Sequence, residues 1–170
     1  QGSLLDYSIL NTDGELQVSS PENDGSDKLI EVERLQFSDS NLAFDLGGNA
    51  GLTAKLLGVL VGDVDPELMG VGLNIFDNSG LSFEEVMELG LNTLLGSERS
   101  NADVMNLIYT NIVGHAPSQS ELNALTEQFL DSGTYTQVGL AVFVADHPLN
   151  AENIGLVGLI QYGAEYIAQA

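Results

Sequence analysis

Residues 100–133 read SNADVMNLIYTNIVGHAPSQSELNALTEQFLDSG, and this stretch establishes the helical character of the chain. Apolar residues recur every three to four positions over Asn101–Val113, which predicts an amphipathic helix that ends at Gly114. Ser118 and Glu121 have the spacing of a capping box and predict the start of a second helix, which ends near Gly133. The stretch therefore predicts two helices joined by a short loop and followed by a Ser-Gly turn.

The same order occurs roughly fifty residues earlier, which indicates an internal repeat. The corresponding positions are Val61-Gly62 with Val113-Gly114, Leu73 with Leu125, and Phe76–Gly80 with Phe129–Gly133. Each copy is expected to contain three helices and to cover the apolar face of the other copy. Seven helices are predicted: Ala50–Val61, Pro66–Asp77, one from Ser82 to Gly96, Asn101–Val113, one from Ser118 to near Gly133, Thr136–Ala145 and Asn150–Ile167.

Before Asn49 the apolar residues alternate with polar ones, which is typical of strands. The fold class predicted is mainly α with a small N-terminal β-ribbon, followed by two tandem three-helix repeats and a C-terminal helix. The predicted boundaries are 4–48 for the ribbon and 49–170 for the helical repeat domain. Residues 1–3, Gln-Gly-Ser, are typical of what remains after an expression tag has been cleaved.

The composition excludes several classes of function. The chain has 170 residues, four of them Lys or Arg and 25 of them Asp or Glu, for a net charge of -21. Binding to nucleic acid requires clustered Lys and Arg, so nucleic acid is not an expected partner. Membrane insertion is not expected either, because the apolar runs are interrupted by Gly or Asp before they reach spanning length. The absence of cysteine excludes disulfides and thiolate metal sites.

Two acidic segments are candidate calcium sites. Gly25-Ser26-Asp27-Lys28-Leu29 is half of the repeat unit that binds calcium in parallel β-rolls, so the carboxylates of Asp13, Asp24 and Asp27 are candidate ligands. The alternative is an Asx-rich turn. Asp63 and Asp65 form the second segment, for which the alternative is that Asp65 caps the following helix. Calcium is the one cofactor that the sequence suggests.

Five segments carry a family resemblance: Val32–Asp39, Leu42–Leu46, Gly48–Gly51, Ile108–Pro117 and Leu156–Tyr166. Together they resemble a helical domain of unknown function that follows hemolysin-type (RTX) calcium-binding repeats in type I-secreted bacterial proteins. The helical fold is also similar to that of phycobilisome linkers. His115 stands where this family usually has Arg, and the first copy lacks both the Tyr and the Arg of the family motif. The family has no assigned catalytic residues.

The resemblance implies a non-catalytic C-terminal module of a large secreted or surface bacterial protein, which caps a calcium-binding β-roll and adjoins the type I export signal. The implied partners are the upstream β-roll repeats of the same polypeptide, with export machinery or a surface polymer as further candidates. The alternative is a binding module for a surface polysaccharide or a protein. An enzyme is not expected, because His115, Ser118, Asp146 and His147 are not accompanied by a nucleophile-elbow motif.

Overall fold

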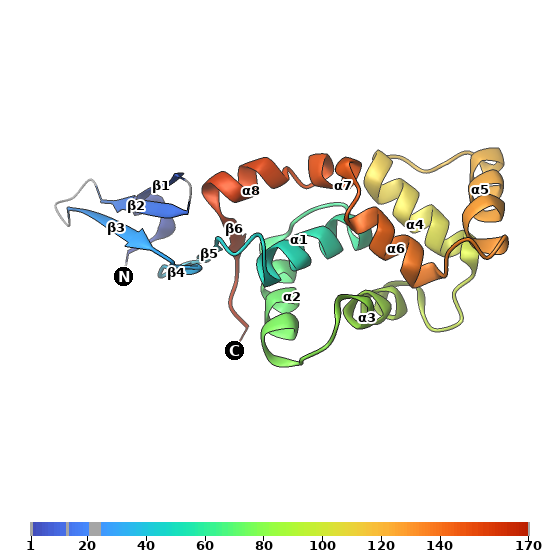
Figure 1. Cartoon of the computed structure of the whole chain (residues 1–170), viewed down its shortest axis with the longest axis horizontal. Coiled ribbons are helices and arrows are strands. Elements are labelled where there is room, and N and C mark those ends of the chain that lie inside the picture. The colour runs from blue at the N-terminus through green and yellow to red at the C-terminus, as the bar shows by residue number, and fades with distance from the viewer. Residues whose placement is uncertain (1, 13, 21–24, 170) are drawn as a thin grey trace.

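The computed structural model describes residues 2–12, 14–20 and 25–169. The chain is mainly helical with a small β region near the N-terminus, which confirms the predicted fold class (Figure 1). The described strands are β1 (Ser8–Thr12), β2 (Glu15–Ser19), β3 (Ser26–Ile30), β4 (Arg34–Gln36), β5 (Asn41–Ala43) and β6 (Ala164–Tyr166), and a short 3₁₀ helix, η1, spans Leu4–Asp6.

The first six predicted helices agree with the structure within one or two residues, which is the usual uncertainty of a helix boundary. They are α1 (Asn49–Leu60), α2 (Pro66–Asn78), α3 (Phe83–Leu95), α4 (Asn101–Val113), α5 (Gln119–Thr126) with its π-helical continuation η2 (Glu127–Asp131), and α6 (Gln137–Ala145).

Side-chain caps explain why the helix starts were predictable. Ser82 and Ser118 each accept a hydrogen bond from the backbone N–H three residues on, and the glutamate there accepts one in return. Asp65 accepts hydrogen bonds from two backbone N–H groups at the start of α2, so the helix-cap interpretation of this residue is confirmed. The structure adds two capping boxes that the sequence analysis had not identified, at Ser3 before η1 and at Ser100 before α4.

The C-terminal helix predicted over Asn150–Ile167 is wrong as a single element. The structure has α7 (Pro148–Asn153), α8 (Leu156–Tyr162) and then β6. Gly155 and Gly163 interrupt the helix with φ values of 61° and 83°, a backbone conformation that other residues rarely adopt. Apolar periodicity alone does not reveal such breaks. The strand β6 was not predictable either, because its pairing partner lies far away in the sequence.

The β region forms two separate sheets. Strands β1, β2 and β3 form an antiparallel meander, in which Ile9 lies opposite Val18 and Leu16 opposite Leu29. Strands β4 and β5 form a hairpin, and β6 pairs antiparallel with β5, so that Ala43 lies opposite Ala164. The segment predicted as one ribbon, 4–48, therefore divides into an outer sheet and a sheet that the C-terminal strand completes.

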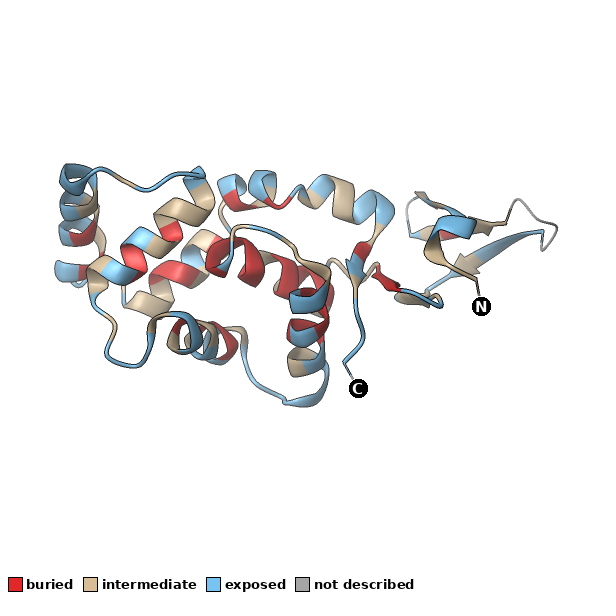
Figure 2. Ribbon diagram, turned by 180° about the vertical axis from the view of Figure 1, so that it is seen from behind, coloured by how far each residue is buried: buried red, intermediate tan, exposed pale blue. Residues whose placement is uncertain are grey.

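Helix α1 is the centre of the helical body. Nine of its 12 residues are buried, and it contacts α2, α3, α4, α6 and α7. Figure 2 shows the buried residues concentrated along this helix. Gly58 allows α7 to pack closely against α1, because a Cβ there would lie 2.1 Å from Oδ1 of the buried Asn150. The first repeat therefore supplies the central helix around which the second repeat and α7 pack.

Corresponding hydrogen bonds support the predicted repeat. The first residue of α1, Asn49, donates to Asp77 at the end of α2, and the first residue of α4, Asn101, donates to Asp131 at the end of η2. Both distances are 2.7 Å. The same polar contact thus joins the first and second helices of each copy, while superposition of the two copies stays a prediction.

The C-terminal strand is held against α2 by a contact that tolerates only glycine. A Cβ at Gly70 would lie 1.8 Å from the carbonyl oxygen of Ile167, whose N–H donates to Pro66 O over 2.9 Å. We expect Gly70→Ala to lower the free energy of unfolding by about 1–3 kcal/mol, since the strand must move away from the helix. Urea denaturation followed by circular dichroism measures the change.

Gly158→Ala is the matched control for this prediction. Gly158 lies inside α8, and a Cβ there would meet no atom within 4 Å. Replacement of a helical glycine by alanine at such a site favours folding by about 0.5–1 kcal/mol. Equal effects of the two substitutions would contradict the proposed docking of β6 on α2.

Candidate functional site

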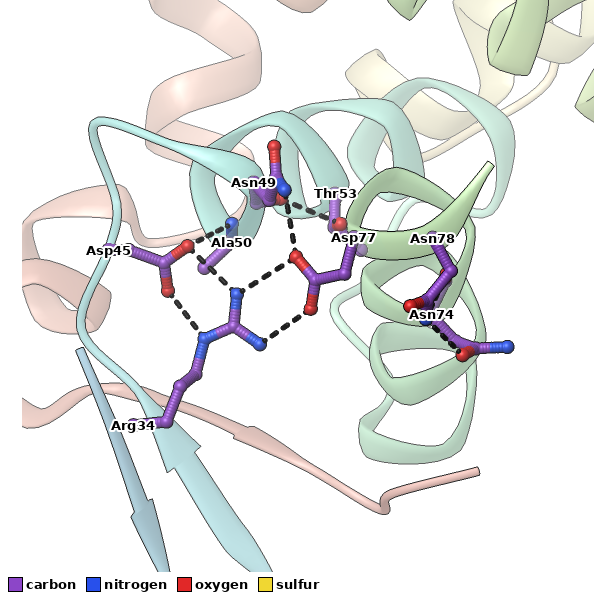
Figure 3. Close-up of polar contacts among 8 residues, drawn as sticks. All are labelled: Arg34, Asp45, Asn49, Ala50, Thr53, Asn74, Asp77 and Asn78. Atoms are coloured by element: carbon purple, nitrogen blue, oxygen red, sulfur yellow. Dashed lines mark hydrogen bonds and ion pairs between the residues drawn. The ribbon is translucent and has the colours of Figure 1, made fainter. Parts of the chain in front are cut away.

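The most densely bonded polar cluster surrounds Arg34, the first residue of β4 (Figure 3). Its Nε donates to Asp45 Oδ1 over 2.8 Å, and its Nη2 donates to Asp45 Oδ2 over 2.9 Å. Its Nη1 donates to Asp77 Oδ2 over 3.2 Å. One guanidinium thus binds a carboxylate from the loop after β5 in a bidentate manner and a second carboxylate from the end of α2.

The two carboxylates also hold the start of α1. Asp45 accepts from the backbone N–H of Ala50 over 3.2 Å, and Asp77 accepts from Asn49 Nδ2 over 2.7 Å. The N-cap position of α1 is Gly48, which has no side chain to satisfy these groups. The ion cluster therefore takes over the capping of the central helix.

The cluster also contacts the end of the chain. The guanidinium carbon of Arg34 lies 5.7 Å from the centre of the Tyr166 ring in β6, within the range of a cation–π contact. Asn41 in β5 donates to the carbonyl oxygen of Tyr166 over 3.4 Å. The resemblance-carrying segments Val32–Asp39, Leu42–Leu46 and Leu156–Tyr166 therefore meet around one arginine.

Burial and hydrogen bonding act in opposite directions on these ionisable groups. Burial opposes the charged form of Asp45, but hydrogen bonds from Arg34 and from Ala50 N–H outweigh it and hold the pKa of the carboxyl below its ordinary value of 3.8. Burial likewise opposes the charge on Arg34, and the bonds to Asp45 and Asp77 raise its pKa above the usual range. Both groups are ionised at neutral pH. A metal ion bound by the two carboxylates would have to lie between them, and the guanidinium already occupies that position.

The candidate calcium ligands do not converge in the part of the chain that the structure describes. Asp13 and Asp24 lie outside the described residues. Asp27 is exposed on β3 opposite Val18, Asp63 is exposed and accepts from the adjacent Val64 N–H, and Asp65 caps α2. Among residues 2–12, 14–20 and 25–169, no group of three or more His, Asp or Glu side chains is placed to hold a metal ion.

The histidines and their polar neighbours lie at separate points of the second repeat. His147 caps α7 by accepting from Leu149 N–H, while the adjacent Asp146 pairs with Lys55 over 2.7 Å. Ser118 serves the capping box of α5. His115 packs edge-on against Tyr109, with ring centroids 5.9 Å apart. Each of these side chains therefore has a local structural partner.

A hydrophobic groove, which the sequence analysis did not identify, opens on the second repeat. It has a volume of about 280 Å³ and lies between α4, the α5–η2 segment, α6 and the start of α7. We call it the α4–α6 groove, and the residues that line it include Ile108, Ile112, Phe129, Leu140, Phe143 and Val144. Helical periodicity predicts that apolar residues of these helices share one face, but only the tertiary arrangement shows which of them stay accessible. Ile108 and Leu140 are buried at the base of the groove, whereas Ile112, Phe129, Phe143 and Val144 are partly exposed.

Comparison with protein-family models, with curated proteins and with solved structures gave no match. The family resemblance therefore stays a prediction. Within the described residues, no helix has the length and apolar character needed to cross a bilayer.

We expect Arg34→Met to lower the free energy of unfolding by about 2–3 kcal/mol. Loss of one partner from a buried pair costs about 3–5 kcal/mol, and this pair is partly exposed, with exposed fractions of 26% for Arg34 and 12% for Asp45. Lys28→Met is the control, because Lys28 and Glu15 form an exposed pair at 66% and 43%. Its effect should stay within about 0.5 kcal/mol by chemical denaturation.

The same cluster predicts a pH dependence. Because the pKa of Asp45 is lower in the folded protein than its ordinary value of 3.8, the stabilisation is complete above that pH and is lost as the pH falls through the folded value. The stability difference between the native chain and Arg34→Met should therefore be full at neutral pH and shrink below about pH 4. A difference that stays constant from neutral pH down to about pH 2 would exclude the ionised Asp45 as the partner of Arg34.

Proposed function

We propose that this chain is a non-catalytic module of a large secreted or surface bacterial protein and that it ends a preceding calcium-binding β-roll. The observation that carries the proposal is the outer sheet of β1, β2 and β3. Among its described residues only Leu16 is buried, at 1% exposure. This sheet lies at one end of the molecule, beyond the helical body (Figures 1 and 2).

A sheet of this kind needs a further layer or further strands. Small antiparallel sheets are stable in water only when a hydrophobic face packs against a helix or another sheet. In the described part of the outer sheet only the side chain of Leu16 is buried, so this requirement is not met. Strand β3 is an outer strand of the meander, and four of its five residues are exposed. Exposed strand edges attract additional strands. Upstream repeats of the same polypeptide would supply both the missing cover and the missing neighbour.

The outer sheet is attached to the rest of the chain on one side. Asn11 in β1 donates to the carbonyl oxygen of Ile160 in α8 over 3.0 Å. Leu4 N–H donates to Asp39 Oδ1 over 2.8 Å, and the rings of Tyr7 and Phe37 lie 5.3 Å apart. These contacts fix the sheet to α8 and to the β4–β5 hairpin, which suits a fixed junction rather than a flexible linker.

Charge supports a role for calcium. All four Lys and Arg side chains already form ion pairs with carboxylates of the chain itself. Cations from the solution must therefore balance the remaining net charge of -21. We propose that Asp27 provides one ligand, with Asp13 and Asp24 as further candidates, and that an upstream repeat completes the site. The end of the chain would adjoin the export signal and be folded into β6 only after export.

Hydrogen exchange tests the capping role. We compare the present chain with a longer one that includes the natural upstream residues, in about 5 mM calcium. Amides of β1–β3 should exchange faster than those of α1 in the present chain, because local openings of a poorly covered sheet cost little free energy. They should become protected in the longer chain. Equal protection of this sheet in both chains would refute the capping role.

Calcium titration gives an independent check. Calcium and sodium at equal ionic strength should stabilise the present chain to a similar degree, since screening relieves the repulsion among its carboxylates. In the longer chain calcium should raise the melting temperature beyond the sodium value, and Asp27→Asn should reduce that excess. If calcium has no excess effect in the longer chain, the outer sheet does not contribute to a calcium site.

A further inference from the structure

The α4–α6 groove distinguishes the second repeat from the first. Helices α1 and α3 of the first repeat approach closely, because a Cβ at Gly90 would lie 2.2 Å from Leu60. Counted from the helix starts, Ile112 corresponds to Leu60 and Val144 corresponds to Gly90. Both Ile112 and Val144 line the groove. A branched side chain where the first repeat has glycine prevents an equally close approach of α6 to α4, and an apolar opening results.

Large apolar side chains at this opening remain exposed. Val113 is 45% exposed, Phe143 is 50% exposed and Leu149 is 52% exposed, and all three line the groove. They come from α4, α6 and α7, which are separate in the sequence. Contiguous exposed apolar surface of this kind, with aromatic residues, is typical of a protein-binding site.

The charge of the chain limits what can bind there. All four Lys and Arg side chains are paired within the chain, and the net charge is -21. Glu121 lies one helical turn before the groove residue Leu125, and its carboxylate is not among those paired with the four Lys and Arg side chains. A second copy of this chain would bring another -21 to the same surface, so self-association is opposed by repulsion. A cationic partner gains attraction instead.

We propose that the α4–α6 groove binds a short cationic amphipathic helix of another protein. The groove follows α4 from Met105 to Val113, a length of about 12 Å at the rise of an α-helix. This is about two helical turns, enough for two or three apolar anchors spaced three or four residues apart. The proposal goes beyond the capping role, because the groove is lined mainly by residues of the second repeat. The helices α4, α5 and α6 lie at the opposite end of the molecule from the outer sheet (Figure 1).

A synthetic probe tests the proposal. The probe is a fluorescent peptide of two copies of Leu-Lys-Lys-Leu-Leu-Lys-Leu, which forms an amphipathic cationic helix. A peptide of the same composition in scrambled order and a peptide with Glu in place of Lys serve as controls. Fluorescence anisotropy at about 0.15 M salt, where long-range attraction is screened, measures binding to the whole chain. The amphipathic cationic peptide should bind at least tenfold more tightly than either control.

Paired substitutions locate the binding site. Phe143 and Leu89 correspond in the two repeats, have similar exposure of 50% and 46%, and only Phe143 lines the groove. Phe143→Glu and Leu89→Glu add the same charge, so any general electrostatic effect is shared. Phe143→Glu should weaken binding roughly tenfold or more, as expected for an apolar anchor site, and Leu89→Glu should leave it within about twofold. Thermal unfolding of both variants establishes that they are folded.

Three results would overturn the proposal. Equal effects of Phe143→Glu and Leu89→Glu would show that only the overall charge attracts the peptide. Equal binding of the scrambled peptide would show that no helix is recognised. Sedimentation equilibrium that detects a dimer, abolished by Phe143→Glu, would assign the α4–α6 groove to a second copy of the chain.

Discussion

The ion cluster of Arg34 with Asp45 and Asp77 is the contact on which the rest of the structure depends. It joins the first strand of the β4–β5 hairpin to the end of α2, and it satisfies the start of α1, which has glycine at its N-cap. The Tyr166 ring lies beside the same guanidinium, so the C-terminal strand is added to the cluster. An ion pair of this kind is weak evidence for net stability but strongly favours one arrangement, because an unpaired buried charge is costly.

The C-terminal strand is held by backbone contacts as well as by this cluster. Strand β6 completes the sheet of β4 and β5, and its backbone reaches α2 through the Ile167 N–H and the close contact at Gly70. The C-terminal strand and the β4–β5 hairpin, which are distant in the sequence, therefore share one sheet, and both contact α2. The outer sheet of β1–β3 is not completed by a strand from elsewhere in the described chain, and most of its residues are exposed. This difference between the two sheets is the reason for proposing that the module follows a longer β structure.

The helices were predictable because their determinants are local. Ser82, Ser118 and Asp65 cap helices within three residues of themselves, and apolar periodicity marks the buried faces. The C-terminal strand and the α4–α6 groove were not predictable, because both depend on contacts between residues that are distant in sequence. The acidic segments were ambiguous for a related reason: Asp65 has the spacing of a cap and the chemistry of a ligand, and only its bonds to backbone N–H groups decide between them.

Native-state hydrogen exchange of β5, β6 and α1 tests most directly whether the cluster makes the β4–β5 hairpin, the C-terminal strand and the central helix one cooperative unit. The account predicts that amides of β5 and β6 exchange only through the same global opening as those of α1, with equal free energies of opening. It also predicts that Arg34→Met lowers all three together. Exchange of β5 and β6 through a separate opening of lower free energy, with α1 still protected, would contradict the account.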